Sequence, residues 1–279
     1  WHILMSMVTL LKTELNLLGL ALGFFTRLPL PQNLNYSPEL LNHSTRYYGV
    51  VGGLIGLLLI PIFWATHTLF PLPLAVLLTI TASLIITGAF HEDGLADMTD
   101  GFGGGYTPER KLEIMKDSRQ GTFGVCAIVL TLSFYYVALA TFSNLSFMAL
   151  SVALLSGHSL SRIMAGTLVA DLPYLRTLDS RAKAKPLSTG LRRRDLVWLL
   201  LSTIPFLALL SWPCALGLIP LLVVIHLLYR QYLLSQFGGY TGDCLGGAQV
   251  ITMISIWLYQ IMWLKLDLTI IAPWLSQLF

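Results

Sequence analysis

The chain has 279 residues, of which 55% are hydrophobic and only 11% are charged, and its net charge is +3. Soluble domains carry about 25% charged residues, so this composition excludes an ordinary soluble domain. Apolar runs of roughly twenty residues recur along the whole chain, and each is long enough to cross a ~30 Å hydrocarbon core as a helix. The composition therefore predicts an all-α protein, a polytopic transmembrane helical bundle.

The apolar segments define the expected helices in chain order. The first, Leu4–Phe25, holds Lys12 and Glu14 in its middle, and it is either an interfacial or re-entrant helix or an eighth span. Seven further segments are expected to span the membrane: Tyr47–Phe70, Pro73–Phe90, Gly121–Phe142, Phe147–Ala170, Asp195–Trp212, Ala215–Ser235 and Leu245–Leu264. No linker or repeat divides the chain, so residues 1–279 are interpreted as a single integral membrane domain.

The connections between these segments alternate in charge. Most of the chain's 17 Lys and Arg residues lie in connections that fall on one face if seven spans follow Arg46. Positively charged connections stay in the cytoplasm. The sequence therefore predicts a multi-pass protein of the bacterial (inner) cell membrane with cytoplasmic active-site loops at 92–120, 171–194 and 236–244.

The segment from Gly88 to Glu109 concentrates negative charge: it reads GAFHEDGLADMTDGFGGGYTPE. If it continues the second span as a helix, Asp93, Asp97 and Asp100 lie within about 60° of one face, and Glu92 points about 100° away from Asp93. Converging carboxylates repel each other unless a cation neutralises them, and hard oxygen ligands suit Mg²⁺ or Mn²⁺. We therefore predict a metal site formed by Glu92, Asp93, Asp97 and Asp100. A solvated acidic helix end is the alternative.

Glycines and basic residues follow the acidic residues. Gly103 and Gly104 end the helix and allow the backbone to approach a ligand closely. A short amphipathic helix then brings Lys116, Asp117 and Arg119 to the mouth of the next span. Arg119 could bind a phosphate and Asp117 could complete a second metal site. For the two basic residues the alternative is ordinary anchoring on the cytoplasmic side.

Two more features are expected at the same site. Arg162 lies inside a span with His158 one turn before it, and a cation within a span is a functional hypothesis by default. A structural bond from Arg162 to a carboxylate on a neighbouring helix is the alternative. Asp243 lies between glycines just before the last span, where helix capping and catalysis are compatible. Carboxylates for metals and cations for phosphates indicate phosphoryl or nucleotidyl transfer at a membrane surface.

Six stretches carry a family resemblance: FFTRLPLP, RYYGVVG, GAFHEDGLADMTDGFGGG, MKDSRQGTFG, SLSR and GGYTGDCLGG. They are similar, in order, to motifs of the cobalamin synthase family. The resemblance implies a membrane enzyme of the last nucleotide-loop assembly step of cobalamin biosynthesis. In such an enzyme adenosylcobinamide-GDP reacts with α-ribazole or its 5′-phosphate, giving adenosylcobalamin or its 5′-phosphate and GMP, with Mg²⁺. The family's last block commonly continues into one or two glutamates, at positions that here hold Val250 and Met253.

The resemblance also implies roles for the candidate residues. Mg²⁺ ions held by the acidic residues would bridge the pyrophosphate, and Lys116 and Arg119 would neutralise the leaving phosphate. Asp243 or a carboxylate of the cluster would orient or deprotonate the attacking hydroxyl. The expected catalytic residues are therefore Asp243, Asp117, Lys116 and Arg119. From the residues themselves, Gly103, Gly104, Arg162 and His158 are expected to bind the cofactor or ligand.

Other partners and other functions are open at this stage. Membrane lipids are expected partners, and nucleic acid is not. Binding to other corrinoid-assembly enzymes is an open possibility. An oligomer is also possible, because glycine-rich spans permit close helix packing. The rival functions are a membrane enzyme like the CDP-alcohol phosphotransferases, a divalent-cation transporter and a scaffold. The CDP-alcohol phosphotransferases have an arginine at the position where this chain has Asp97.

Overall fold

The computed structural model describes residues 2–175, 191–266 and 269–274. Its regular elements within these ranges are helices, and β-structure is limited to two isolated bridges, Tyr174 with Tyr240 and Leu210 with Ile271. The elements are α1 (His2–Phe25), α2 (Pro38–Ser44), the 3₁₀ helix η1 (Thr45–Tyr47), α3 (Tyr48–Leu69), α4 (Leu72–Thr87), α5 (Phe90–Gly104), α6 (Pro108–Met115), α7 (Thr122–Leu145), α8 (Phe147–Asp171), α9 (Arg193–Leu207), α10 (Trp212–Phe237) and α11 (Gly242–Lys265). The predicted all-α fold is confirmed.

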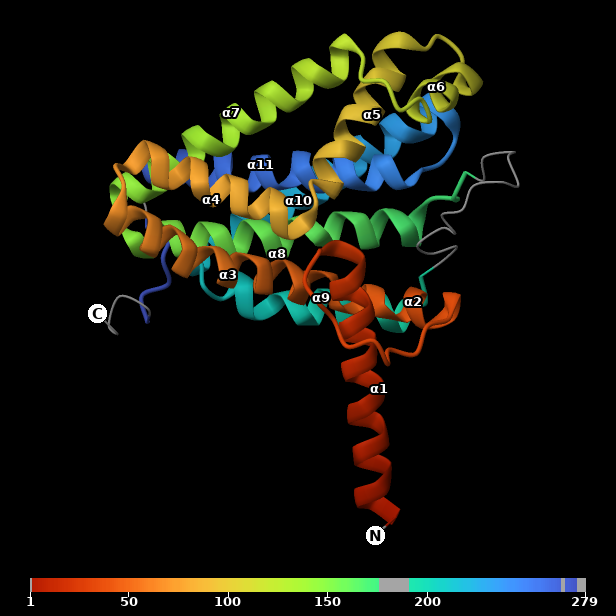
Figure 1. The fold of residues 1–279 in the computed structure, drawn as a ribbon, viewed down its shortest axis with the longest axis horizontal. Helices are drawn as coiled ribbons and strands as arrows, with labels where there is room; N and C mark the ends of the chain where they lie inside the picture. Colours follow the sequence, from red (N-terminus) through yellow and green to blue (C-terminus); the bar gives the residue numbers. More distant parts are fainter. Residues whose placement is uncertain (1, 176–190, 267–268, 275–279) are drawn as a thin grey trace.

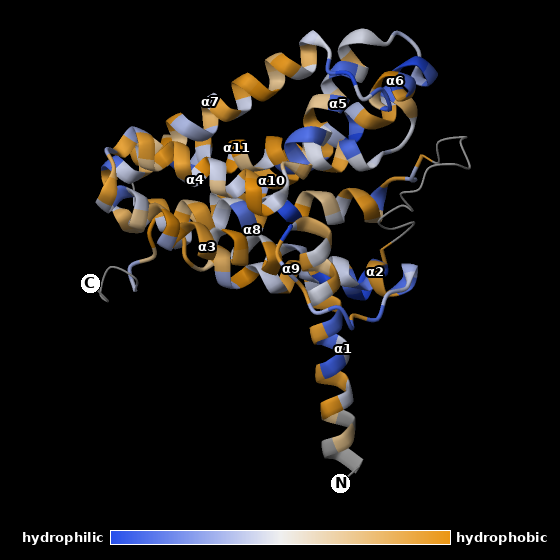
Figure 2. Ribbon diagram, viewed as in Figure 1, coloured by the Kyte–Doolittle hydropathy of each residue, from blue (hydrophilic) through white to orange (hydrophobic). Residues whose placement is uncertain are grey.

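Most of these helices form a bundle around α8. Helices α3, α4, α8, α9, α10 and α11 run lengthwise beside one another, while α7 diverges from them toward α6 (Figure 1). By length and composition, six described helices could cross a membrane, or seven if the bent pair α4 and α5 counts as one span. Figure 2 shows hydrophobic residues along the bundle helices and hydrophilic residues gathered at α5 and α6. The chain is therefore a polytopic membrane protein with its polar residues at one end.

Close packing of α3 against α8 depends on glycines. An added Cβ at Gly52 would lie 2.0 Å from the carbonyl oxygen of His158, and one at Gly56 would lie 2.7 Å from that of Leu154. Small residues let the backbones of membrane helices approach closely. The glycine-rich face of α3 is therefore used within the chain, and it positions α8 with Arg162 in the centre of the bundle.

The acidic segment departs from the sequence prediction. We expected it to continue the second span as one helix, and this was wrong, because α4 ends at Thr87 and α5 leaves it at an angle of 86°. Gly88 (φ 67°) and Ala89 (φ 53°) both adopt the left-handed conformation and break the helix between the two elements. Consequently, the acidic residues lie on a separate helix.

The predicted span Asp195–Trp212 also needs correction. The helix there is α9, which has 15 residues and holds Pro205 near its end. At 1.5 Å per residue it is about 22 Å long, shorter than a ~30 Å hydrocarbon core. It is not among the helices long enough to cross a membrane on their own. The bundle therefore holds this helix as a shorter element beside α3 and α8.

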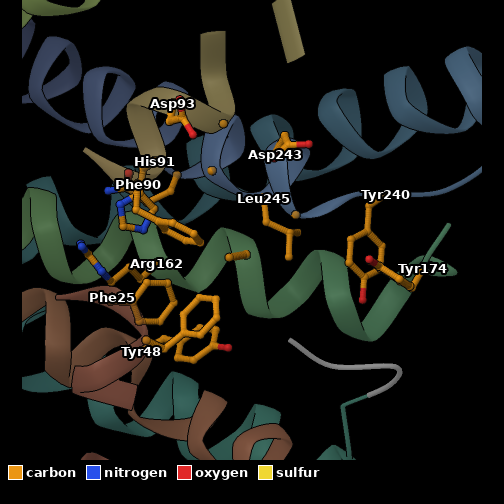
Figure 3. A pocket seen from close by; sticks show the side chains of 16 residues that line it. Phe25, Tyr48, Phe90, His91, Asp93, Arg162, Tyr174, Tyr240, Asp243 and Leu245 are labelled. Carbon is orange, nitrogen blue, oxygen red and sulfur yellow. The ribbon is translucent and has the colours of Figure 1, made fainter. Parts of the chain in front are cut away.

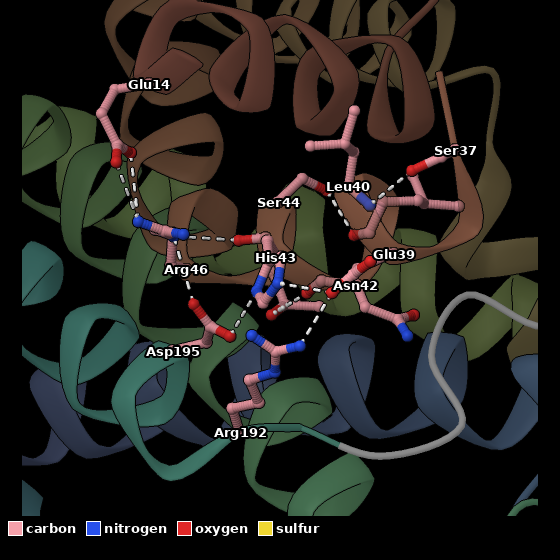
Figure 4. A network of polar contacts seen from close by, with 12 residues as sticks. Glu14, Ser37, Glu39, Leu40, Asn42, His43, Ser44, Arg46, Arg192 and Asp195 are labelled. Atoms are coloured by element: carbon pink, nitrogen blue, oxygen red, sulfur yellow. Dashed lines mark hydrogen bonds and ion pairs between the residues drawn. The ribbon is translucent and has the colours of Figure 1, made fainter. Parts of the chain in front are cut away.

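Helix α1 runs crosswise to the bundle and joins it only at its C-terminal end (Figure 1). A polar network holds this junction together (Figure 4). Arg46 donates to Glu14 at 3.0 Å and pairs with Asp195 at 3.3 Å, while His43 Nδ1 lies 2.8 Å from Asp195. The Tyr47 hydroxyl also donates to Glu14 at 2.7 Å. The network explains why α1 tolerates Glu14, because the carboxylate is paired at the junction.

Candidate active site

Asp93 and Asp243 come together where α5 packs against α11. Both residues line a cavity of about 260 Å³ (Figure 3). Glycines make the approach possible: an added Cβ at Gly94 would lie 3.0 Å from the carbonyl oxygen of Asp243, and one at Gly246 would lie 3.1 Å from that of His91. As a result, Asp243 lies within electrostatic reach of both Asp93 and Asp97, although 150 residues separate it from Asp93 in the chain.

The chemistry of these three carboxylates fits a hard divalent cation. Asp93 is exposed, Asp97 and Asp243 are partly buried, and their negative charges repel each other. Carboxylate oxygens of this kind suit Mg²⁺, which keeps several waters and binds through one or two carboxylates and substrate phosphates. As the side chains stand, no three His, Cys, Asp or Glu residues of the described ranges are gathered tightly enough to hold one ion. The predicted metal site stays a prediction.

Asp100 has a structural role in this conformation. Its two carboxylate oxygens accept hydrogen bonds from the backbone N–H groups of Gly121 at 2.6 Å and Gly124 at 2.8 Å. These N–H groups belong to the first turn of α7, so Asp100 caps that helix from α5. An added Cβ at Gly121 would lie 2.4 Å from the carboxylate. The two glycines therefore make room for Asp100, and its predicted metal binding remains untested.

Glu92 faces the interior of the bundle instead of the aspartates. It is buried, and one of its oxygens accepts a hydrogen bond from the Tyr135 hydroxyl at 3.3 Å. Its carboxylate attracts the buried guanidinium of Arg162. Arg162 Nη1 donates to the His158 carbonyl oxygen at 2.6 Å, and the guanidinium lies 5.7 Å from the centre of the Phe25 ring. Arg162 therefore lies close enough to Glu92 for electrostatic attraction, without a hydrogen bond to it, and its predicted functional role stays a prediction.

Arg119 and Asp117 form an exposed ion pair after α6. Arg119 Nη2 donates to Asp117 Oδ2 at 2.6 Å, and Nε donates to Oδ1 at 3.0 Å. These bonds lower the pKa of Asp117 to about 2. Lys116 ends α6 and is exposed. The Asp117 carboxylate is thus engaged by Arg119, and the Lys116 ammonium remains solvent-accessible.

The predicted site residues divide between two neighbouring recesses. Asp93, Arg162 and Asp243 line the cavity between α5, α8 and α11. A second recess, of about 380 Å³, is more open. Its lining includes the predicted residues Asp100, Gly104, Asp117 and Arg119. Gln120 links the groups, because it lines the second recess and donates to Asp97 Oδ1 at 3.2 Å.

Gly103 and His158 serve packing in this structure. An added Cβ at Gly103 would lie 2.4 Å from the Phe123 ring, so the missing side chain makes room for α7. His158 is buried beside Trp257, with ring centres 6.2 Å apart. Their predicted contact with a ligand stays a prediction. Part of the predicted loop 171–194, residues 176–190, lies outside the described residues.

Sequence reasoning missed the aromatic wall of the cavity. The ring-bearing side chains that line it are Phe24, Phe25, Tyr48, Phe90, His91, Tyr174 and Tyr240. A signal existed, because several of these residues belong to the FF, YY and FH pairs of the quoted motifs. It missed Lys111 as well, which is buried, bonds to Gln236 and lies 5.9 Å from the centre of the Phe102 ring.

The chain was compared with known proteins. A family model described as Cobalamin-5-phosphate synthase matches residues 17–261. A protein of Vibrio cholerae serotype O1, named adenosylcobinamide-GDP ribazoletransferase, is 40% identical over 264 residues, which cover 95% of this chain and 100% of the relative. Proteins of the same name from Shewanella amazonensis and Shewanella frigidimarina are each 42% identical, over 88% of this chain and 95% and 94% of their own lengths. No solved structure shows significant similarity. By these matches, the chain belongs to the cobalamin-5-phosphate synthase family.

Proposed function

We propose that this protein is an adenosylcobinamide-GDP ribazoletransferase that uses Mg²⁺. It joins adenosylcobinamide-GDP to α-ribazole or its 5′-phosphate and releases GMP. The observation that carries the proposal is that Asp93 of α5 and Asp243 of α11 line one aromatic cavity, with Asp97 within electrostatic reach of Asp243. The names of the relatives support the same reaction.

The reaction is a displacement at phosphorus. A ribose hydroxyl of the acceptor forms a bond to the phosphorus that carries the cobinamide, and the bond from that phosphorus to the oxygen of the GMP phosphate breaks. Asp243 accepts the proton of the hydroxyl, because it is a partly buried carboxylate at the cavity mouth. Mg²⁺, held by Asp93 and Asp97, would neutralise charge on the diphosphate.

The basic residues after α6 bind the departing phosphate. Arg119 is exposed at the second recess and presents a planar guanidinium that suits phosphate oxygens, and Lys116 adds a mobile positive charge nearby. The Asp117 carboxylate holds the Arg119 side chain until phosphate competes for it. Asp117 therefore positions Arg119 instead of contacting the substrate.

The site faces the cytoplasm of a bacterial cell, in this proposal, and the bundle lies in the inner membrane. The charge distribution supports this orientation, because basic residues gather in the connections on the side of α5 and α6. Helix α1 then lies along the membrane, since it runs crosswise to the bundle (Figure 1). Exposed apolar residues of α1, among them Met7, Leu11 and Leu15, suit contact with lipid.

The test is turnover by purified protein in liposomes. GMP release from adenosylcobinamide-GDP and α-ribazole is measured by chromatography with and without Mg²⁺, for the wild type and for Asp93→Asn, Asp243→Asn and Glu109→Gln. Glu109 is an exposed acid of α6 outside both recesses, so its variant is the control. We expect the Asp243 variant to lose about 10²-fold or more in rate, as for a general base.

Three outcomes contradict the proposal. The first is absence of GMP release by the wild type with Mg²⁺, and the second is a wild-type rate in Asp243→Asn. The third is Mg²⁺ flux through the liposomes without any GMP release, which would identify a divalent-cation transporter.

A further inference from the structure

The cavity beside the aspartates has room for a planar ring system. Its volume is about 260 Å³, below the ~300–1,000 Å³ that is usual for pockets that hold a whole ligand. Aromatic side chains supply much of its wall, and they come from four separate parts of the chain: Phe25 from α1, Tyr48 from α3, Phe90 from α5 and Tyr240 from the loop before α11. Aromatic walls favour a flat, apolar ligand that stacks on them.

The rings of the wall are already arranged around one another. Phe25 and His91 are stacked at 5.5 Å with an angle of 11° between their planes, and Phe25 meets Tyr48 edge-on at 4.4 Å. Tyr174 and Tyr240 form a second edge-on pair at 5.5 Å. Because the rings hold each other in place, the wall is formed before a ligand arrives.

The closed end of the cavity presents hydrogen-bond donors. Tyr48 and Arg162 line the cavity with relative exposures of 0% and 1%. The Tyr48 hydroxyl and Arg162 Nε have no hydrogen-bond partner among the described residues. Buried polar groups are almost always hydrogen-bonded, and the guanidinium can only donate. The closed end therefore suits a ligand that brings an acceptor, such as an unprotonated ring nitrogen.

The mouth of the cavity bears the carboxylates. Asp93 and Gly242 are exposed and Asp243 is partly buried, in contrast to the fully buried Tyr48. Figure 3 shows Asp93 and Asp243 on one side of the cavity, and Tyr48 and Phe25 on the other. A nucleoside whose base enters the cavity would therefore leave its ribose beside Asp93 and Asp243, where the attacking hydroxyl is needed.

We propose that this cavity binds the base of the acceptor nucleoside, a planar heteroaromatic ring with a ring-nitrogen acceptor. The inference rests on the proposed function and identifies which substrate occupies this part of the site. The base of ribazole is a dimethylated benzimidazole, which is flat, apolar and free of ring donors once it is attached to ribose. Guanine fits less well, because its N1–H and amino group add donors that the aromatic rings of the wall cannot pair, although its O6 and N7 can accept. The guanosine diphosphate part therefore lies outside the cavity.

Steady-state kinetics with each substrate varied in turn test this assignment. Tyr48→Phe removes the hydroxyl and keeps the ring, while Tyr232→Phe makes the same change on α10, outside the cavity. Loss of one hydrogen bond between neutral groups predicts that Tyr48→Phe raises KM for α-ribazole about three- to tenfold. KM for adenosylcobinamide-GDP should change less than about twofold on the same scale. A rise in KM for adenosylcobinamide-GDP alone, or equal values in the two Tyr variants, overturns the proposal.

Binding of the free base provides a test that does not depend on turnover. The probe is 5,6-dimethylbenzimidazole, titrated calorimetrically into the detergent-solubilised protein and into Gly242→Leu. Gly242 lines the cavity mouth and an added Cβ there meets nothing within 4 Å, so the variant places a bulky side chain at the mouth. We expect binding to the wild type and its loss in the variant, with guanine binding neither. Guanine binding, equal binding to both proteins, or no binding to the wild type refutes the cavity assignment. If the base binds as expected but GMP is never released, the proposed function fails and the cavity assignment stands.

Discussion

Replacement of Asp100 by alanine separates a structural role from a metal-binding role. The change removes two hydrogen bonds from a charged acceptor to the backbone N–H groups of Gly121 and Gly124. Each bond of this kind contributes about 1.5–3 kcal/mol. Water can replace the bond to Gly121, which is partly exposed, but Gly124 is buried and keeps an unpaired donor. We therefore expect a loss of about 3 kcal/mol in the free energy of unfolding, less than two full bonds.

The assay is thermal unfolding in detergent, with EDTA and with Mg²⁺. At about 2 °C per kcal/mol for a chain of this length, Asp100→Ala should lower the midpoint by about 6 °C in EDTA. The matched control is Asp97→Ala on the same helix, whose carboxylate receives a single side-chain bond, from Gln120 at 3.2 Å. The control should unfold near the wild-type temperature in EDTA and lose the stabilisation that Mg²⁺ confers. An Asp100→Ala protein that matches the wild type in EDTA, and differs only when Mg²⁺ is added, would refute the capping role.

Three further predictions address packing, the junction with α1 and the basic loop. Gly52→Ala places a methyl group 2.0 Å from a backbone oxygen of α8, so we expect most of the variant to aggregate in detergent, as measured by size-exclusion chromatography. In the control, Gly242→Ala, the methyl group meets no atom within 4 Å, and the elution profile should match that of the wild type. Asp195→Ala removes a buried carboxylate that bonds to His43 and Arg46, which are themselves partly buried, and Arg46 keeps its bond to Glu14. We expect a loss of about 1.5–3 kcal/mol, as for a hydrogen bond to a charged group, measurable as a lower thermal midpoint. Arg119→Gln should raise the pKa of Asp117 from about 2 toward its ordinary value, as read by carboxyl ¹³C NMR. Because the folded pKa is depressed, the ion pair stabilises the wild type above pH ~4 and loses its effect between pH ~4 and ~2, and the variant should show no such loss.

The sequence predicted which segments are helical better than it predicted where each helix ends and how α4 and α5 are oriented. Runs of apolar residues are a direct consequence of what a bilayer requires, so α3, α7, α8, α10 and α11 were found with small boundary errors. The break between α4 and α5 was missed because it depends on Ala89, a residue with no preference for the left-handed conformation. The length of α9 was overestimated because its apolar pattern continues past Pro205, beyond the end of the helix.

Only part of the candidate site could be predicted in the same way. Acidic residues are rare in an apolar chain, which is why Asp93, Asp97, Asp100 and Asp243 were all recognised. Which of them face one another depends on how closely α5 and α11 pack, and that contact is tertiary. For this reason Asp100 points toward the start of α7, whereas Asp243 lines the same cavity as Asp93. Charge alone could not distinguish a helix cap from a functional carboxylate.

The crosswise α1 affects the order in which the site is assembled. Its C-terminal end supplies Phe25, which stacks on His91 of α5 and meets Tyr48 of α3. The place of Phe25 therefore depends on α3 and α5 packing beside the end of α1. A version of the protein that began after Phe25 would keep all its acidic residues and lose one wall of the cavity. Closure of the cavity thus depends on α1, and the rest of the bundle alone is not a complete site.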